Sequence, residues 1–248
     1  MPAGPGMTIL EGLQYIREHL DATLAWRFSC RMGICGSCAV VINGRSGLAC
    51  NTQILDISDS EIRLEPLANF PVIRDLVPDL GSMFDKHVRL RPYLIRADQD
   101  EIDASLGEFE QSPEQLLEFN QFSYCIKCGA CMSACPTMAQ DAAFFGPMPL
   151  TAAHRYNSDS RDQGFAERGR ALDTGHAAAH CHYAGECSRV CPKGVDPGRA
   201  IQLMKRSLVM ELLRLRKSAD RTRLIEPPVA QNVDDESLRP PPFTAKHT

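Results

Sequence analysis

A compact run of cysteines, CIKCGACMSACP, occupies residues 125–136. Its C-x2-C-x2-C-x3-C-P spacing is a known ligand run for iron–sulfur clusters, in which three thiolates hold one cluster and the fourth holds a second. The two-residue gaps let a tight loop wrap a small cluster, whereas the longer gap and the following proline turn Cys135 away. A zinc site or a disulfide pair is the alternative, but zinc prefers two separated C-x2-C pairs. The run therefore favours iron–sulfur chemistry.

A second group of cysteines has the spacing C-x4-C-x2-C with a later single cysteine, which is typical of a plant-type 2Fe–2S cluster. Gly33 and Gly36 lie in this loop, and glycine lets backbone N–H groups approach the cluster sulfurs. A predicted strand at 39–42 and a hairpin turn at 43–44 (Asn-Gly) would bring the last cysteine back to the others. Four buried structural thiols are the alternative. The predicted ligands are Cys30, Cys35, Cys38 and Cys50.

The third group follows the pattern C-x5-C-x3-C-P at residues 181–192 and resembles an internal repeat of residues 125–136. Aligning the Cys-Pro ends places Ala184 opposite Cys128, and alanine has no donor atom. If the last cysteine of each copy serves the other copy's cluster, one set has four thiolates and the other has three. The predicted sets are Cys125, Cys128, Cys131 and Cys191 for a 4Fe–4S cluster, and Cys135, Cys181 and Cys187 for a 3Fe–4S cluster.

The 248-residue chain contains eleven cysteines, and the three predicted sets use all of them. An odd number disfavours a pure disulfide framework. The formal net charge of -4 argues against nucleic acid as the main partner. No apolar run approaches the roughly 18 residues needed to span a bilayer, so a membrane anchor would have to come from another chain. Neither a G-x-G-x-x-G fingerprint nor a P-loop is present, which favours electron transfer over substrate chemistry.

Hydrophobic periodicity predicts an α+β chain. Thr8 and Glu11 form a capping-box pattern at the start of a helical stripe over 8–20. A second helical pattern covers 72–90, where Pro78 should break it. Strands are also predicted at 53–57 and 61–65, and helices at 114–123, after Pro136, as a pair across 150–173, and at 198–217.

Composition divides the chain into four segments. An acidic, weakly patterned stretch separates a mixed N-terminal part from a helical C-terminal part, and the end of the chain is rich in proline. The predicted segments are 1–97, a plant-type 2Fe–2S ferredoxin domain; 98–112, a linker; 113–225, an all-helical, bacterial-ferredoxin-like domain with the 4Fe–4S and 3Fe–4S clusters; and 226–248, a disordered tail.

Four stretches resemble the iron–sulfur subunit of the succinate dehydrogenase / fumarate reductase family. They are SCRMGICGSC at 29–38, FPVIRDLV at 70–77, HRYNSDSRDQG at 154–164 and CPKGVDP at 191–197. The resemblance runs from about Ile9 to Arg216. The first stretch, the RYNSDSRD run and the last stretch look more like the fumarate-reductase branch, whereas His182 after Cys181 looks more like succinate dehydrogenases. The direction of catalysis therefore stays open.

The resemblance implies an electron-transfer subunit of a succinate:quinone or quinol:fumarate oxidoreductase, without substrate chemistry on this chain. Electrons would pass between the FAD of a flavoprotein subunit and a membrane quinone through the 2Fe–2S, 4Fe–4S and 3Fe–4S clusters. The implied partners are the flavoprotein, one or more membrane anchor subunits and quinone. The implied location is peripheral, on the cytoplasmic face of the inner (plasma) membrane.

The resemblance also implies a quinone site near Pro136, His182 and Lys205. A protonated lysine or histidine there could hydrogen-bond a quinone oxygen. The alternative for Lys205 is a basic amphipathic helix that rests on acidic lipid or on a partner. The alternative for His182 is packing against a cluster.

The N-terminal domain of this family is of the β-grasp type and begins with a β-hairpin. Only seven residues precede Thr8 in this sequence. The ferredoxin-like sheet is therefore expected to lack its first hairpin, which would leave an unpaired strand edge. A translation start upstream of Met1 is the explanation that we expect.

Two competing functions remain. The same three-cluster module could serve another flavoprotein–quinone or heterodisulfide-reductase-like complex, and the stretches outside the cysteine motifs disfavour this. A non-redox zinc scaffold is the other, and the cysteine spacing disfavours it.

Overall fold

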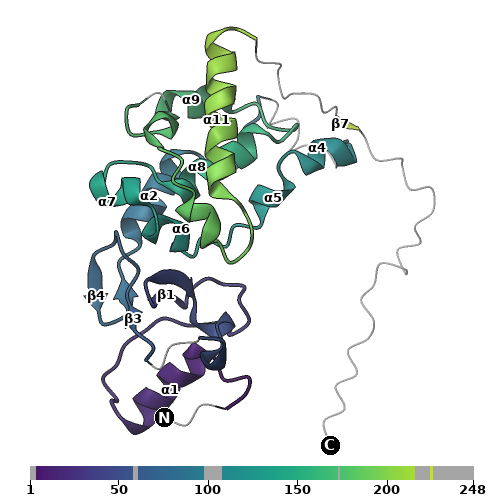
Figure 1. Ribbon diagram of the computed structural model, residues 1–248. Coiled ribbons are helices and arrows are strands. Elements are labelled where there is room, and N and C mark those ends of the chain that lie inside the picture. Colours follow the sequence, from purple (N-terminus) through teal and green to yellow (C-terminus); the bar gives the residue numbers. More distant parts are fainter. Residues whose placement is uncertain (1–3, 58–60, 98–107, 173, 216–223, 226–248) are drawn as a thin grey trace, which may run out of the picture.

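The computed structural model describes residues 4–57, 61–97, 108–172, 174–215 and 224–225. Figure 1 shows two parts stacked on one another, with α1 and β1 in the N-terminal part and α8 and α11 in the C-terminal part. One hydrophobic core runs through both parts, from Leu13 in the first to Met132 and Ile201 in the second. Most of the predicted linker (98–107) and the predicted tail (226–248) lie outside the described residues.

The first helix, α1 (Ile9–His19), begins as predicted. Thr8 Oγ1 accepts a hydrogen bond from Glu11 N (3.3 Å), and Glu11 Oε2 accepts one from Thr8 N (2.7 Å). This reciprocal capping satisfies N–H groups that a helix start leaves without partners. The apolar face of α1 buries Ile9, Leu10 and Leu13. The predicted capping box and helix are confirmed.

A three-stranded antiparallel sheet with the order β2-β1-β3 forms beside α1. Its strands are β1 (Ala39–Ile42), β2 (Arg45–Leu48) and β3 (Leu64–Glu65). Asn43 and Gly44 have φ values of 47° and 77°, as a two-residue hairpin turn requires. The hairpin leads into the 3-10 turn η1 (Ala49–Asn51), which carries Cys50. The predicted hairpin is confirmed.

Two predicted elements of the N-terminal part are wrong. Residues 53–57 contain the 3-10 turn η2 (Ile54–Asp56) instead of a strand. The helical pattern at 72–90 is helical only in α2 (Gly81–Arg89), after the short antiparallel pair β4 (Val72–Arg74) and β5 (Val77–Pro78). Asp75 explains the difference, because its φ of 45° makes a turn and its Oδ2 accepts a hydrogen bond from Ala25 N (2.8 Å).

Short helices make up most of the C-terminal part, and α8 and α11 pack against each other at its centre. Proline stands in the first turn of helices α4, α7, α8 and α11. A backbone N–H at that position has no partner within the helix, so proline costs no hydrogen bond there. The elements are α4 (Pro113–Leu117), α5 (Asn120–Ser123), α6 (Ala130–Ser133), α7 (Pro136–Gln140), α8 (Pro147–Asn157), α9 (Phe165–Leu172), η3 (Ala178–His180), α10 (Glu186–Arg189) and α11 (Pro197–Leu212).

The sequence-predicted helices at 114–123, after Pro136 and across 150–173 are present in divided or slightly shifted form. The predicted helix at 198–217 ends at Leu212. The C-terminal part is not entirely helical as predicted, because β6 (Glu108–Phe109) pairs with β7 (Leu224–Ile225). β6 falls in the predicted linker (98–112), so this pair joins the linker to the end of the C-terminal part. No local sequence pattern predicts it.

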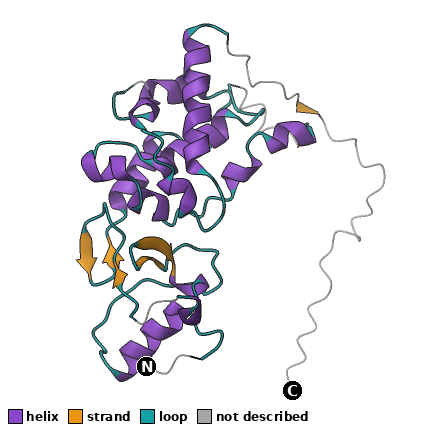
Figure 2. Cartoon of the chain, in the orientation of Figure 1, coloured by secondary structure: helices purple, strands orange, loops and turns teal. Residues whose placement is uncertain are grey.

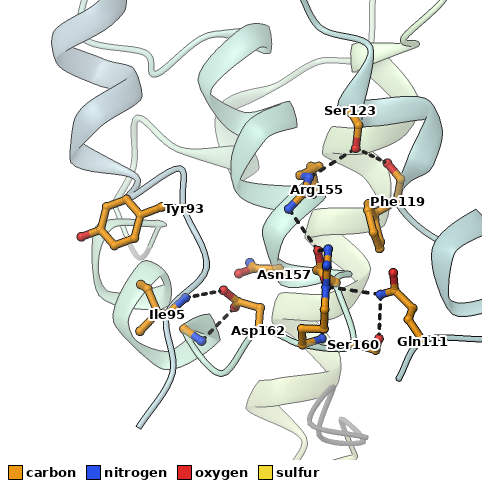
Figure 3. A network of polar contacts seen from close by, with 12 residues as sticks. Tyr93, Ile95, Gln111, Phe119, Ser123, Arg155, Asn157, Ser160 and Asp162 are labelled. Atoms are coloured by element: carbon orange, nitrogen blue, oxygen red, sulfur yellow. Dashed lines mark hydrogen bonds and ion pairs between the residues drawn. The ribbon is translucent and has the colours of Figure 1, made fainter. Parts of the chain in front are cut away.

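A buried ion pair joins the turn after α8 to α9, and both of its side chains also bind the backbone of the segment that follows α2. Arg168 Nη1 lies 2.6 Å from Asp162 Oδ1, and the two side chains are 0% and 1% exposed. Arg168 Nη2 donates to Tyr93 O (2.5 Å), and Ile95 N donates to Asp162 Oδ2 (3.0 Å). Figure 3 shows Ile95 directed at Asp162, with Tyr93 above it. The pair therefore fastens the end of the N-terminal part to the helical part.

A second charged group lies on the other side of the same turn. Asp159 is fully buried and forms ion pairs with two arginines. Its Oδ2 lies 3.1 Å from Arg155 Nη1, and its Oδ1 lies 2.8 Å from Arg161 Nε. The Arg155 guanidinium also lies 4.6 Å from the centre of the Phe119 ring. Gln111 Nε2 donates to Ser160 Oγ (2.9 Å), as Figure 3 shows. The turn at 157–162 thus contacts chain segments on both of its sides.

We expect Asp162→Asn to lower the free energy of unfolding by about 3–5 kcal/mol, because it leaves the Arg168 charge buried without its carboxylate. Thermal unfolding followed by circular dichroism measures this. The control is Glu65→Gln, which breaks the exposed Arg63–Glu65 pair and should cost at most about 1 kcal/mol. Equal melting temperatures for the two variants would contradict the prediction.

Candidate iron–sulfur sites

The N-terminal cysteines come together around the loop at 30–38. Gly33 N donates to Cys50 Sγ (3.3 Å), although the two residues are far apart along the loop and hairpin. Cys35 N donates to Cys30 Sγ (3.3 Å), and Cys50 N donates to Cys38 Sγ (3.5 Å). Backbone N–H groups aimed at cysteine sulfur are the contacts that tune iron–sulfur clusters. The donor set and its backbone therefore fit a 2Fe–2S cluster.

This first group has an exposed side and a buried side. Cys35 is exposed, and hydrogen bonds from Cys30 N and from Ser37 lower the pKa of its thiol to about 6. Cys38 is buried, and the loss of solvation raises the pKa of its thiol to about 12. Thiolate is the form that binds metal. A bound cation would therefore have to offset the free-energy cost of deprotonating the buried Cys38 thiol.

Cysteines from both copies of the repeat line one cavity in the helical part. Cys125, Cys128 and Cys131 of the first copy face Cys191 of the second, with Met148 and Thr151 of α8 in the cavity wall. Val195 N donates to Cys191 Sγ (3.4 Å). Burial, together with the neighbouring thiols, raises the pKa of Cys128 to about 11 and raises the pKa of Cys131 well above its usual value. Four soft donors in a mainly apolar cavity fit a 4Fe–4S cluster.

A second cavity is lined by the remaining three cysteines. Cys135 of the first copy lies there with Cys181 and Cys187 of the second, and Ala184 is part of the same lining. Tyr183 N donates to Cys181 Sγ (3.4 Å). Burial raises the pKa of Cys187 to about 11. This cavity thus has three thiols and an apolar methyl group at the position that the sequence alignment left without a ligand.

The backbone repeats in the two copies. Gly129 (φ 84°) precedes α6, and Gly185 (φ 80°) precedes α10 at the same position of the second copy. Lys127 and Tyr183 also correspond, with φ values of 53° and 57°. These left-handed residues let each loop turn tightly before its short helix. The internal repeat predicted from the Cys-Pro alignment is confirmed by this geometry.

The three sequence-predicted quinone residues lie near Cys181. Pro136 is in the lining of the second cavity. Lys205 of α11 is half-buried, and its Nζ donates to Cys181 O (2.7 Å). His182 is exposed, with its ring 5.8 Å from that of His180. The structure therefore gathers the candidates around one cysteine.

A polar cluster of one aspartate and two histidines in the same region was not predicted from the sequence. Asp141 Oδ2 lies 2.6 Å from His176 Nδ1 and 3.4 Å from His180 Nε2. The hydrogen bond to His176 lowers the pKa of the Asp141 carboxyl. Histidines at 176, 180 and 182 were the available sequence signal, but nothing local indicated the carboxylate that joins two of them.

Two further observations describe the chain as a whole. Within the described residues, no three or more His, Cys, Asp or Glu side chains converge on a position for a single metal ion. Among the helices of that part of the chain, none combines the length and the apolar character that crossing a bilayer requires.

Comparisons with known proteins agree with the two cysteine-bearing parts. A family model for a 2Fe-2S iron-sulfur cluster binding domain matches residues 1–85, and one for a 4Fe-4S dicluster domain matches residues 121–195. The fumarate reductase iron-sulfur subunit of Mycobacterium tuberculosis (strain CDC 1551 / Oshkosh) is 48% identical over 206 residues, which are 83% of each chain. The chain belongs to the fumarate reductase and succinate dehydrogenase iron–sulfur subunits.

Both branches of this family of iron–sulfur subunits are represented among the relatives. The fumarate reductase subunit of Haemophilus influenzae is 42% identical over 78% of each chain, and the succinate dehydrogenase subunit of Paracoccus denitrificans is 36% identical over 82% of this chain and 77% of its own. The fold resembles a chain of the Mycobacterium smegmatis Sdh1 complex in the apo form, with a TM-score of 0.73 and 24% identity over 84% of this chain and 87% of that one.

Proposed function

We propose that the chain is the electron-transfer subunit of a fumarate reductase or succinate dehydrogenase, and that it relays electrons between the FAD of a flavoprotein subunit and a membrane quinone. The observation that carries this proposal is that the eleven cysteines of the chain form three separate groups. The chain also belongs to the family whose iron–sulfur subunits it resembles in sequence. Bound iron–sulfur clusters supply one-electron carriers. The chain supplies the ligands, the spacing and the insulation.

The proposed ligands follow the three groups. A 2Fe–2S cluster would be held by Cys30, Cys35, Cys38 and Cys50. A 4Fe–4S cluster would be held by Cys125, Cys128, Cys131 and Cys191. A 3Fe–4S cluster would be held by Cys135, Cys181 and Cys187. Support for the division comes from the N–H···S contacts of the first group and from the linings of the two cavities. Support for a three-iron cluster comes from Ala184, which brings a methyl group where the first copy has a thiol.

Pro136, His182 and Lys205 are the proposed quinone contacts. The Lys205 ammonium already donates to the carbonyl of Cys181, so it could hold a quinone oxygen close to the second cavity. The flavoprotein, anchor subunits and quinone are proposed partners. The proposed location is peripheral, at the cytoplasmic face of the inner membrane.

The finer description of the fold is also a proposal. We place a β-grasp ferredoxin domain at 1–97, a linker at 98–112, and a helical ferredoxin domain at 113–225. The β2-β1-β3 sheet packed near α1 supports the first assignment. The helices that surround both cavities support the last.

The purified holoprotein should be brown and should contain iron and acid-labile sulfide in the ratio that one 2Fe–2S, one 4Fe–4S and one 3Fe–4S cluster require. Metal analysis and a sulfide assay measure this. A colourless protein with zinc and without labile sulfide would contradict the proposed function and support a zinc scaffold.

Ala184→Cys should convert the third cluster to a 4Fe–4S cluster, because it adds the missing thiolate at the position equivalent to Cys128. The EPR signal of the oxidised three-iron cluster should be lost. Glu186→Cys is the matched control, since it adds a thiol to the same cavity lining at another position of the repeat, and it should keep the signal. An unchanged signal in Ala184→Cys would refute the assignment.

Lys205→Met should slow quinone reduction by the assembled complex roughly tenfold or more, as expected when a hydrogen bond to a charged group worth about 1.5–3 kcal/mol is lost. Transfer to a soluble dye that accepts electrons from the flavoprotein should be unchanged. Lys205→Arg should restore part of the rate, and Arg206→Met, which changes the exposed neighbour, should have no effect. A parallel loss of dye reduction would argue against the quinone role.

A further inference from the structure

Gly36 of the N-terminal cysteine loop lies directly against the cysteine run of the helical part. A Cβ atom at Gly36 would lie 2.8 Å from Cys128 Cβ, 2.9 Å from Cys128 Cα and 3.1 Å from Ile126 O. Carbon atoms that are not bonded ordinarily stay about 3.5–4.0 Å apart. Two of the three atoms belong to the backbone, so they cannot rotate aside. The space for a side chain at this position is therefore absent.

The other glycine of the same loop gives a direct comparison. Gly33 has a φ of 70°, close to the 76° of Gly36, so both adopt a backbone conformation that disfavours side chains. The nearest atom to a Cβ at Gly33 is Asn51 Oδ1 at 3.7 Å, which is an ordinary contact. The need for glycine at position 33 is explained by the backbone alone. At position 36 it also depends on the neighbouring part of the molecule.

The approach of the two parts is fixed by polar contacts close to this point. Asn69 Nδ2 donates to Met132 O (2.9 Å), Ser133 O (3.0 Å) and Cys135 O (3.1 Å), which lie at the end of α6 and just beyond it. Ser46 Oγ of β2 donates to Ser133 Oγ (3.0 Å). The N-terminal part therefore docks on the same run that contains Cys128, and the contact at Gly36 is part of that docking.

We propose that Gly36 is a positioning residue for electron transfer between the first and second cysteine groups. Because it lacks a Cβ, the backbone of one cluster loop touches the Cα and Cβ of a ligand of the next. Electron tunnelling slows steeply as the gap between redox groups widens, so a contact that keeps this gap short favours fast transfer. The inference rests on the proposed function, because it takes Cys35, Cys38 and Cys128 as cluster ligands.

The test is Gly36→Ala in the full-length holoprotein, with Gly33→Ala as the matched control. Both variants add one methyl group to the same loop at a left-handed position, but only in Gly36→Ala must the loop and the cysteine run that it touches move about half an ångström or more apart. The readout is EPR power saturation of the reduced 2Fe–2S signal, which relaxes faster when a second reduced cluster lies close by. We expect Gly36→Ala to weaken this enhancement while both cluster signals remain, and Gly33→Ala to keep it in full.

Asn69→Gly provides a second variant if Gly36→Ala does not retain its 2Fe–2S cluster. It preserves the left-handed backbone of Asn69 (φ 64°) and removes three hydrogen bonds across the interface. It should weaken the relaxation enhancement with the cluster loop unchanged. Full enhancement in Asn69→Gly, or in Gly36→Ala with both clusters present, would overturn the inference. A parent protein without the cluster signals would instead refute the proposed function.

Discussion

The helical part depends on an exchange between its two cysteine copies. Cys191 of the second copy lines the cavity of the first, and Cys135 of the first lines the cavity of the second. Neither cavity can therefore form from one continuous segment. Burial raises the pKa of Cys128 and Cys187, so their charged forms are costly without a bound cation. Folding of this part and binding of its clusters should consequently be coupled.

The same cysteine run also serves as the docking surface for the N-terminal part. Asn69 donates to three carbonyl groups at the end of α6 and just beyond it. Outside the run, Lys86 Nζ of α2 adds hydrogen bonds to Ala142 O (2.6 Å) and Phe144 O (2.7 Å). A shared apolar core continues across this contact. Because the clusters would be held by the elements that make the interface, small changes there should alter their relative positions.

The sequence determined the features that depend on residues close together along the chain. The Thr8 capping box and the Asn43-Gly44 hairpin are formed by residues a few positions apart, so a local pattern predicts them. The cysteine spacings are likewise visible as short runs in the sequence. The repeat alignment also predicted which cysteines share each cavity, because copies with the same spacing adopt the same loop. The position of Ala184 followed from it.

Only the tertiary structure decided the contacts between distant segments. Periodicity predicted a helix at 72–90, but Val72 and Ile73 are exposed on a strand pair whose turn is held by a hydrogen bond to Ala25. No local sequence pattern indicated that Asp141 would bind His176 or that Gly36 would approach Cys128. Such contacts depend on how elements pack against one another, and a one-dimensional pattern records which face of an element is apolar but not what that face meets.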